Sequence, residues 1–184
     1  KVTHTTESEP SSTTPEETLE QAYQQLKDEV ANELLHLVKG NTPEFFEKLV
    51  VHLIVAMGYG GSVKEAGKAT RKTADEGIDG VIKEDRLGLD AIYLQAKRWE
   101  AVVGRPEIQK FVGALHGQRA KKGVFITTSR FSKEALDYVG QIDPKVVLID
   151  GTDLVQLMID HGVGVSSAAV YEVKKVDTDF FIED

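Results

Sequence analysis

Apolar residues recur at intervals of three or four through residues 14–40, which is the period of an amphipathic helix. Thr14 is the expected N-cap, with Pro15 at the first helical position. Glu17 completes a capping box with Thr14, and Gly40 ends the helix. We expect this helix to pack on the rest of the domain, with a dimerising or interdomain helix as the alternative. Its apolar stripe consists of Leu19, Tyr23, Leu26, Val30, Leu34 and Leu37.

The same start signal recurs at Thr42, and the second predicted helix ends at Gly58. Glu47 lies at the edge of its apolar stripe, where an unpaired charge is costly, so we expect this carboxylate to have a partner. The residues alone favour a structural ion pair over a role in a metal site. Glu44, one turn earlier, is explained as an acid near the positive end of the helix dipole.

Polar and apolar residues alternate in GIDGVIK (residues 77–83) and DAIYLQAK (residues 90–97), which predicts a β-hairpin around the polar loop EDRLGLD. Gln95 and Lys97 share one face of the second strand, and Asp79 meets them from the first. Mg²⁺ prefers oxygen ligands, and a lysine beside it can hold or deprotonate an attacking water. We therefore predict an active site on this hairpin.

The rest of the chain alternates between helix and strand patterns. Residues 123–128 form a continuous apolar run, which is typical of a strand buried on both faces in the middle of a sheet. Residues 104–122 are predicted to form a helix with Pro106 at its first position. This order predicts an α/β fold with a partly parallel sheet between helices. Further strands are expected at 59–64 and 146–149, and further helices at 132–139 and 151–161.

Composition limits the classes of function. The 184 residues give room for one domain plus a tail. The chain has no cysteine and therefore no thiolate metal site, and its five histidines lack zinc-ligand spacing. No apolar run approaches the roughly 18 residues of a membrane span, and no signal-peptide pattern opens the chain, so we expect no membrane segment and a cytoplasmic location.

The net charge of −8 argues against a general polyanion binder, but the charge is uneven along the chain. Residues 60–122 hold 13 of the 22 basic residues and 9 of the 30 acidic residues. The predicted hairpin lies within this basic segment, which would suit a phosphate-bearing ligand.

Candidate phosphate contacts lie on both sides of the hairpin. A polar loop before it holds four basic residues, and a phosphate-facing loop and a solvated connector explain them equally well. Asp75, near the end of this loop, could position the loop or contact the metal region, and ranks below Asp79. Arg98 and Trp99 could contact backbone and sugar, although Trp99 is equally well explained as a packing anchor. The basic residues of the loop are Lys64, Lys68, Arg71 and Lys72.

The two ends of the chain are expected to lie outside the domain. Residues 1–13 are Thr, Ser and Glu with almost nothing apolar, which predicts a disordered linker. The chain begins at Lys1 without an initiator methionine, which suggests a fragment of a longer polypeptide. Residues 163–184 are predicted to be a loosely packed C-terminal arm.

Asp79, fifteen intervening residues and then Gln95-Ala96-Lys97 resemble the PD-(D/E)XK nuclease signature, with glutamine in the place of the second acid. The flanking DEGIDG and KRW segments resemble those of the Mrr-type restriction endonucleases in particular. GRPEIQKFVGAL and KKGVFITTSRFSKEA are also similar to the segments that follow the QxK strand in that family. Four such segments in this order cover most of the chain, which makes the resemblance specific.

The resemblance implies a restriction-endonuclease-like mixed central sheet flanked by helices on both faces. It places a catalytic domain at residues 41–162, after a linker helix at residues 14–40, and implies a winged-helix-like DNA-recognition domain N-terminal to this chain. Phe46-Glu47 matches the FE pair of the family, which brings Glu47 into the metal site. Gln109 matches the glutamine of a family helix and becomes a candidate DNA contact.

The function implied by the resemblance is a Mg²⁺-dependent (or Mn²⁺-dependent) endonuclease acting on double-stranded DNA. Glu47, Asp79 and the Gln95 side-chain oxygen would hold the metal, and Lys97 would orient or activate the attacking water. Methylated DNA is the implied target of the full protein. Cutting both strands implies a homodimer.

Two other classes of function are open. Because Gln95 is neutral, the metal cage has one charge fewer, which favours a weak or inactive DNA-binding or sensing module on a nuclease fold. A regulatory or scaffold domain is the third interpretation. Lys97 argues against both, since a lysine on the same strand face as a potential ligand suits chemistry better than a core.

Overall fold

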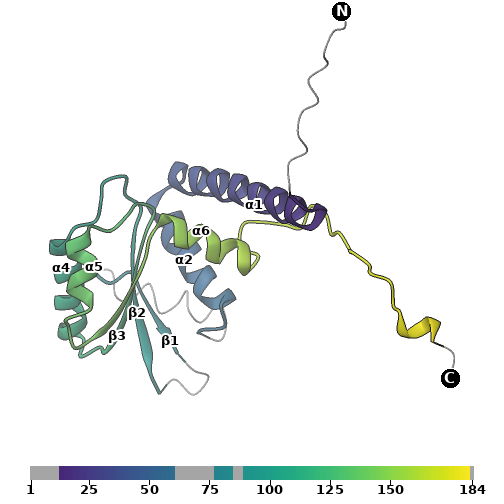
Figure 1. Ribbon diagram of the computed structural model, residues 1–184. Coiled ribbons are helices and arrows are strands. Elements are labelled where there is room, and N and C mark those ends of the chain that lie inside the picture. Colours follow the sequence, from purple (N-terminus) through teal and green to yellow (C-terminus); the bar gives the residue numbers. More distant parts are fainter. Residues whose placement is uncertain (1–12, 61–76, 85–88, 183–184) are drawn as a thin grey trace, which may run out of the picture.

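The computed structural model describes residues 13–60, 77–84 and 89–182, which form a three-layer α/β structure. A four-stranded sheet lies between two layers of helices (Figure 1). β1 is antiparallel to β2, whereas β2, β3 and β4 run parallel. The expected mixed sheet with helices on both faces is therefore confirmed. In spatial order the strands are β1 (Gly80–Lys83), β2 (Ala91–Lys97), β3 (Lys122–Thr127) and β4 (Lys145–Ile149).

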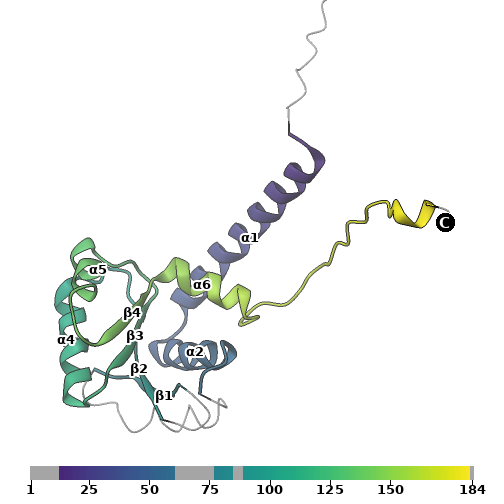
Figure 2. The same cartoon turned by 60° about the horizontal axis from the view of Figure 1, so that its bottom comes forward.

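The helices divide between the two faces of the sheet (Figure 2). One face is covered by α1 (Pro15–Gly40), α2 (Pro43–Ala56) and α6 (Gly151–Asp160). The other is covered by α4 (Arg105–Gly117) and α5 (Lys133–Val139). β3 therefore lies mid-sheet and is buried on both faces, as its apolar run predicted.

Alternating side chains of the central strands pack into two separate hydrophobic cores. Val124 and Ile126 of β3 pack with α2 and α6. Phe125, between them, points to the other face, where its ring meets Phe111 of α4 edge-on with centroids 5.6 Å apart. A Cβ on Gly123 would lie 2.8 Å from Phe111, so the glycine at this position permits the close approach of α4.

The predicted hairpin is present, with Val81 opposite Tyr93 across β1 and β2. At the end away from Asp79, the Lys122 ammonium bonds the carboxylates of Asp90, at 2.8 Å, and of Glu84. The hydrogen bond with Asp90, and then that with Glu84, raise the pKa of Lys122. This three-residue cluster fastens the hairpin to β3.

The helix expected at residues 104–122 is shorter than predicted. Gly104 is its N-cap, so Pro106 occupies the second helical position, and the helix ends at Gly117. Arg119 then takes a left-handed backbone conformation with φ of 54°, which turns the chain into β3. Of the strand expected at residues 59–64, Tyr59 and Gly60 are not extended, and the rest lies outside the described residues.

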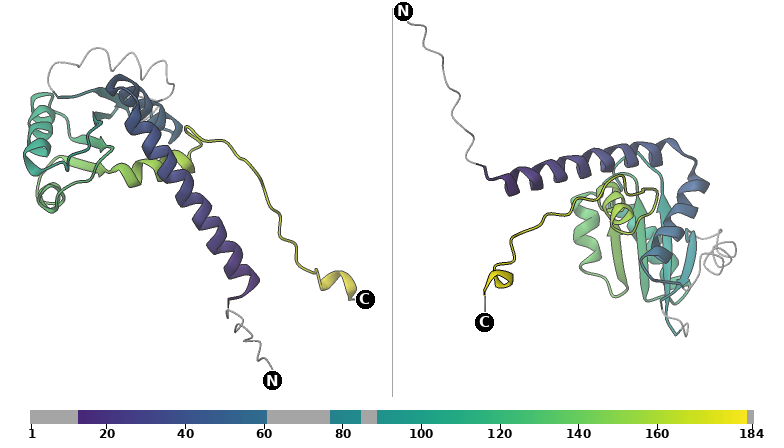
Figure 3. Two further views of the ribbon diagram at one scale, coloured as in Figure 1. Left: turned by 90° about the horizontal axis from the view of Figure 1, so that it is seen from above. Right: turned by 90° about the vertical axis from the view of Figure 1, so that its right-hand side faces the viewer.

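The prediction that the apolar stripe of α1 packs on the domain is wrong. The capping box of Thr14 and Glu17 is present, and Leu34 of the stripe is buried. Its other members, Leu19, Tyr23, Leu26, Val30 and Leu37, are all at least 42% exposed. The helix instead packs through Ala31, Leu34 and Val38 against the α2 and α6 layer, and its first half extends beyond the body of the domain (Figure 3).

The C-terminal residues leave the domain after α6. Val163 is buried, whereas the chain from residue 166 onward is exposed and holds one 3₁₀ turn, η1 (Asp179–Phe181). Figures 1 and 3 show this segment leading away from the sheet. The described helices include none that is long and apolar enough to cross a membrane.

Candidate active site

The hairpin brings Asp79 and Gln95 into contact. Asp79 immediately precedes β1 and extends its pairing, since its backbone N–H donates to the Leu94 carbonyl at 2.8 Å. Its carboxylate oxygen Oδ2 accepts hydrogen bonds from the Gln95 side-chain amide and from the backbone N–H of Ala96, the latter at 2.7 Å. The Asp79 carboxylate is therefore held at a fixed point beside β2.

Gln95 is 2% exposed and its amide has a defined direction. Its Nε2 points to Asp79, while its Oε1 faces Gly77, where an added Cβ would lie 3.5 Å away. In this orientation Gln95 orders the Asp79 carboxylate as a donor. Turning the amide over would present the oxygen at the same point, because the two ends of an amide have similar shapes.

Glu47 approaches this pair from α2. Partial burial raises the pKa of the Glu47 carboxyl, and the nearby negative charges of Asp79 and then Glu44 raise it further, while Lys97 lowers it. The charges of Asp79 and Lys97 therefore both act on the Glu47 carboxyl, which is consistent with a shared site. The residues alone left an ion pair and a metal site open for Glu47, and the repulsion by Asp79 and Glu44 favours the metal site.

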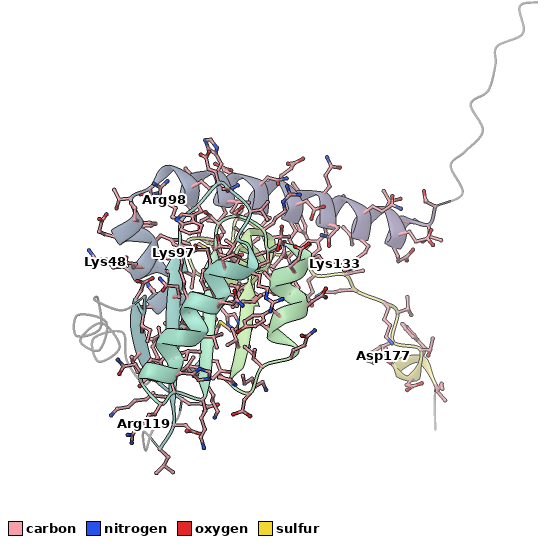
Figure 4. All side chains as sticks on the ribbon, turned by 90° about the vertical axis from the view of Figure 1, so that its left-hand side faces the viewer. Lys48, Lys97, Arg98, Arg119, Lys133 and Asp177 are labelled. Carbon is pink, nitrogen blue, oxygen red and sulfur yellow. The ribbon has the colours of Figure 1, made fainter. Side chains whose placement is uncertain are left out.

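Lys97 is the last residue of β2 and is half-buried. Figure 4 shows it on the same side of the molecule as Lys48 of α2, at the opposite end from Arg119. The parity of the strand places it two residues from Gln95 on the same face, as the hairpin pattern predicted. The site thus combines two acids, an amide and an ammonium group.

This donor set fits a hard divalent cation. No cluster of three acidic or histidine side chains exists within the described ranges that could by itself enclose a metal. Mg²⁺, however, is usually held by one or two carboxylates together with waters and substrate phosphates. Glu47 and Asp79 would supply those carboxylates, and a cation between them would remove the repulsion that raises the pKa of Glu47.

Comparison with known proteins assigns this chain to a family. Residues 38–158, well over half of the chain, match the Mrr_cat family, described as restriction endonuclease. The chain belongs to the Mrr-type restriction endonuclease family. The type IV methyl-directed restriction enzyme EcoKMrr of Escherichia coli (strain K12) is 47% identical to it over 167 residues.

That alignment covers 91% of this Mrr-type chain and 54% of EcoKMrr, so the chain spans about half the length of its relative. Among solved structures, the DNA modification-dependent restriction endonuclease AspBHI superposes with a TM-score of 0.53 at 19% identity. The superposition covers 72% of this chain and 36% of that one, and it supports the restriction-endonuclease fold.

The predicted DNA contacts of the Mrr-type domain lie on different elements: Arg98 and Trp99 follow β2, and Gln109 lies on α4. Arg98 is half-buried and its Nη1 donates to the Lys39 carbonyl, near the C-terminal end of α1, at 2.7 Å. Its Nε is buried without a partner among the described residues. Trp99 is 36% exposed beside it. Gln109 is exposed on α4, in the helical layer opposite the one that carries Glu47.

The predicted contacts Arg71 and Lys72, together with Asp75, lie outside the described residues. One set of site-adjacent residues was not predicted. Thr127, Thr128 and Ser129, at the end of β3, bond the chain that follows Lys97. Three consecutive hydroxyl residues at the end of an apolar strand were the available signal.

Proposed function

We propose that this chain is the catalytic domain of a divalent-metal-dependent endonuclease that hydrolyses phosphodiester bonds in double-stranded DNA. The observation that carries the proposal is the Asp79 carboxylate, fixed by Gln95 and Ala96, with the charges of Glu47 and Lys97 beside it. Membership of the restriction endonuclease family supports the reaction class.

The reaction follows from the roles of the four side chains. Glu47 and Asp79 would hold Mg²⁺ or Mn²⁺, with Gln95 ordering Asp79 or offering its oxygen. The bound ion would polarise a phosphate oxygen and favour ionisation of a water. Lys97 orients the water for in-line attack on phosphorus and stabilises negative charge on the phosphate oxygens. The bond from phosphorus to the 3′ oxygen breaks as the bond from the water oxygen to phosphorus forms. The attacking water gives up a proton, the 3′ oxygen takes one up from solvent, and the products are a 5′-phosphate and a 3′-hydroxyl.

We infer the substrate of the whole protein from its relative EcoKMrr. EcoKMrr is methyl-directed and about twice as long as the aligned segment, so we propose that the full protein acts on methylated DNA. The reader of the modification would lie in an N-terminal DNA-recognition domain beyond this chain. The domain described here then supplies cleavage, and by itself should bind DNA weakly because its net charge is −8.

Cleavage by the purified chain tests the proposal. We expect a DNA duplex to be cut with Mg²⁺ or Mn²⁺ and to stay intact with EDTA. Lys97→Ala should lower the rate at least about 100-fold, the usual contribution of a positioned proton-transfer group. Lys133→Ala is the matched control, because Lys133 is also a lysine but is exposed on α5, away from the site (Figure 4).

Thermal unfolding of each variant separates loss of chemistry from loss of structure. Metal-dependent DNA binding without cleavage by the wild-type chain would favour the inactive sensing module. Equal activity of Lys97→Ala and Lys133→Ala would remove Lys97 from the mechanism.

A further inference from the structure

β3 ends in three consecutive hydroxyl residues that are withdrawn from solvent. Thr127 is 0% exposed, Thr128 1% and Ser129 8%. The ladder between β2 and β3 ends where Lys97 pairs with Thr127. Past this point the chain after Lys97 leaves the sheet. The Lys97 carbonyl still accepts from two backbone donors, the N–H of Thr128 at 3.3 Å and the N–H of Trp99 at 3.0 Å.

Each of the three hydroxyls adds one hydrogen bond to a carbonyl of this segment. Thr127 Oγ1 donates to the Lys97 carbonyl at 2.9 Å, Thr128 Oγ1 to the Trp99 carbonyl at 2.8 Å and Ser129 Oγ to the Glu100 carbonyl at 2.9 Å. A buried carbonyl without a partner is costly, so each bond fixes one peptide group of the segment.

The same segment is also bonded to α1. The Arg98 side chain donates to the Lys39 carbonyl of α1, so the segment has hydrogen bonds both to β3 and to α1. Behind the hydroxyls, the first residue of α6 packs closely: a Cβ on Gly151 would lie 2.5 Å from the Thr128 carbonyl oxygen. Gly151 also donates its N–H to the Ser129 carbonyl at 2.8 Å. The end of β3 therefore has little room to shift.

We propose that Thr127 is a positioning residue for Lys97, and that Thr128 and Ser129 hold the chain that follows. Thr127 is the member of the run whose hydroxyl bonds the lysine's own peptide group, so its loss would displace the ammonium relative to Asp79 and Glu47. The inference rests on the proposed catalytic role of Lys97. Valine would fill the same space as threonine, so what matters at position 127 is the hydroxyl and not the volume.

A pair of matched substitutions tests this. Thr127→Val and Thr128→Val remove the same group from equally buried positions, but only the first takes a hydroxyl donor from the Lys97 carbonyl. Thr127→Val also removes the acceptor of the Ser129 N–H, which lies 3.1 Å from Thr127 Oγ1. We expect Thr127→Val to lower kcat about 10- to 100-fold, the scale of a misplacement of about 1 Å, with the Kd for a duplex in Ca²⁺ unchanged within about twofold. Thr127→Ser should restore most of kcat.

The matched variant, Thr128→Val, should affect stability more than catalysis. Thr128→Val should lower the melting temperature, by no more than Thr127→Val does, and reduce kcat less than about threefold, because the Thr128 hydroxyl bonds the Trp99 carbonyl and not that of Lys97. Trp99 is the sole tryptophan, so its fluorescence should shift in Thr128→Val. If the two variants lose kcat equally, in step with their lost stability, the hydroxyls are only structural and the inference is overturned.

A readout independent of cleavage keeps this inference separate from the proposed function. The Trp99 N–H donates to the Lys97 carbonyl at 3.0 Å, so its hydrogen exchange reports on that peptide group. We expect faster exchange in Thr127→Val than in wild type, measured by NMR. Should the wild-type chain not cut DNA, the proposed function fails, and unchanged exchange in Thr127→Val would overturn the positioning role as well.

Discussion

A single residue type explains how the site keeps its acid in place. Glutamine at position 95 donates to Asp79 from a site that is 2% exposed. A glutamate there would set two carboxylates against each other in a buried place, which raises a carboxyl pKa and weakens folding. With a neutral amide at position 95, the metal site has one negative charge fewer, and the Asp79 carboxylate is ordered by a hydrogen bond. Strand alternation predicted the partners, but not which end of the amide faces Asp79, because both ends have the same shape.

Glu47 should lower the stability of the metal-free protein. Its folded-state carboxyl pKa is above the ordinary value of 4.5, so the folded state binds the proton more tightly than the unfolded state does. The penalty is nil well below pH 4.5, develops as the pH rises from 4.5 to the raised folded pKa and is complete above that pKa. We expect Glu47→Gln to raise the melting temperature at pH 7 in EDTA, and to leave it unchanged near about pH 3.

Added Mg²⁺ should reverse this order, because a ligand that binds the folded state stabilises wild type more than the variant. Thermal melts across pH, with and without the ion, check both halves of the prediction. A wild-type protein that is more stable than Glu47→Gln in EDTA at pH 7 would indicate an ion pair in place of a metal site.

At the scale of elements, local pattern predicted the hairpin and failed for one face of α1. Asp79 and Gln95 lie 16 residues apart, and the antiparallel pairing of β1 with β2 brings them together. The buried face of α1 depends on α6, to which Lys27 bonds through Asp160, 133 residues later at 3.2 Å. A stripe at helical spacing cannot reveal so distant a partner. The end of α4 was missed for a similar reason, since β3 must begin early enough for Lys122 to pair with Lys145 of β4.

Two leucines of the same helix should respond differently to truncation. Leu34 is 6% exposed in the core, whereas Leu26 is 61% exposed. Leu34→Ala should cost about 2–5 kcal/mol of unfolding free energy. Leu26→Ala should stay within about 0.5 kcal/mol. Urea denaturation with unchanged slopes measures both, and an equal loss in Leu26→Ala would mean that the stripe of α1 is covered in solution.

For the whole molecule, net charge and exposed apolar surface have opposite effects on self-association. A net charge of −8 per chain opposes free association, while the exposed stripe of α1 offers a contact surface. One site of this kind cuts one strand, so cutting both requires two chains. We propose that pairing depends on DNA, since a bound duplex bridges and screens the charges.

Sedimentation of the chain with and without a duplex, in Ca²⁺ to suppress cleavage, tests this pairing. We expect monomers alone and two chains per duplex. A DNA-free dimer that dissociates on Leu26→Asp would assign the contact to α1 instead.

The bond between Thr127 and Lys97 spans 30 residues, and that between Arg98 and Lys39 spans 59. The Asp79–Gln95 contact spans 16. Shorter loops close at a lower entropic cost, and hairpins form within microseconds, so we expect the Asp79–Gln95 contact to form early during folding. The lysine would be locked in place only after β3 has joined the sheet. A chain still emerging from the ribosome would then have an ordered Asp79 carboxylate before Lys97 is fixed, which ties cleavage to completion of the domain.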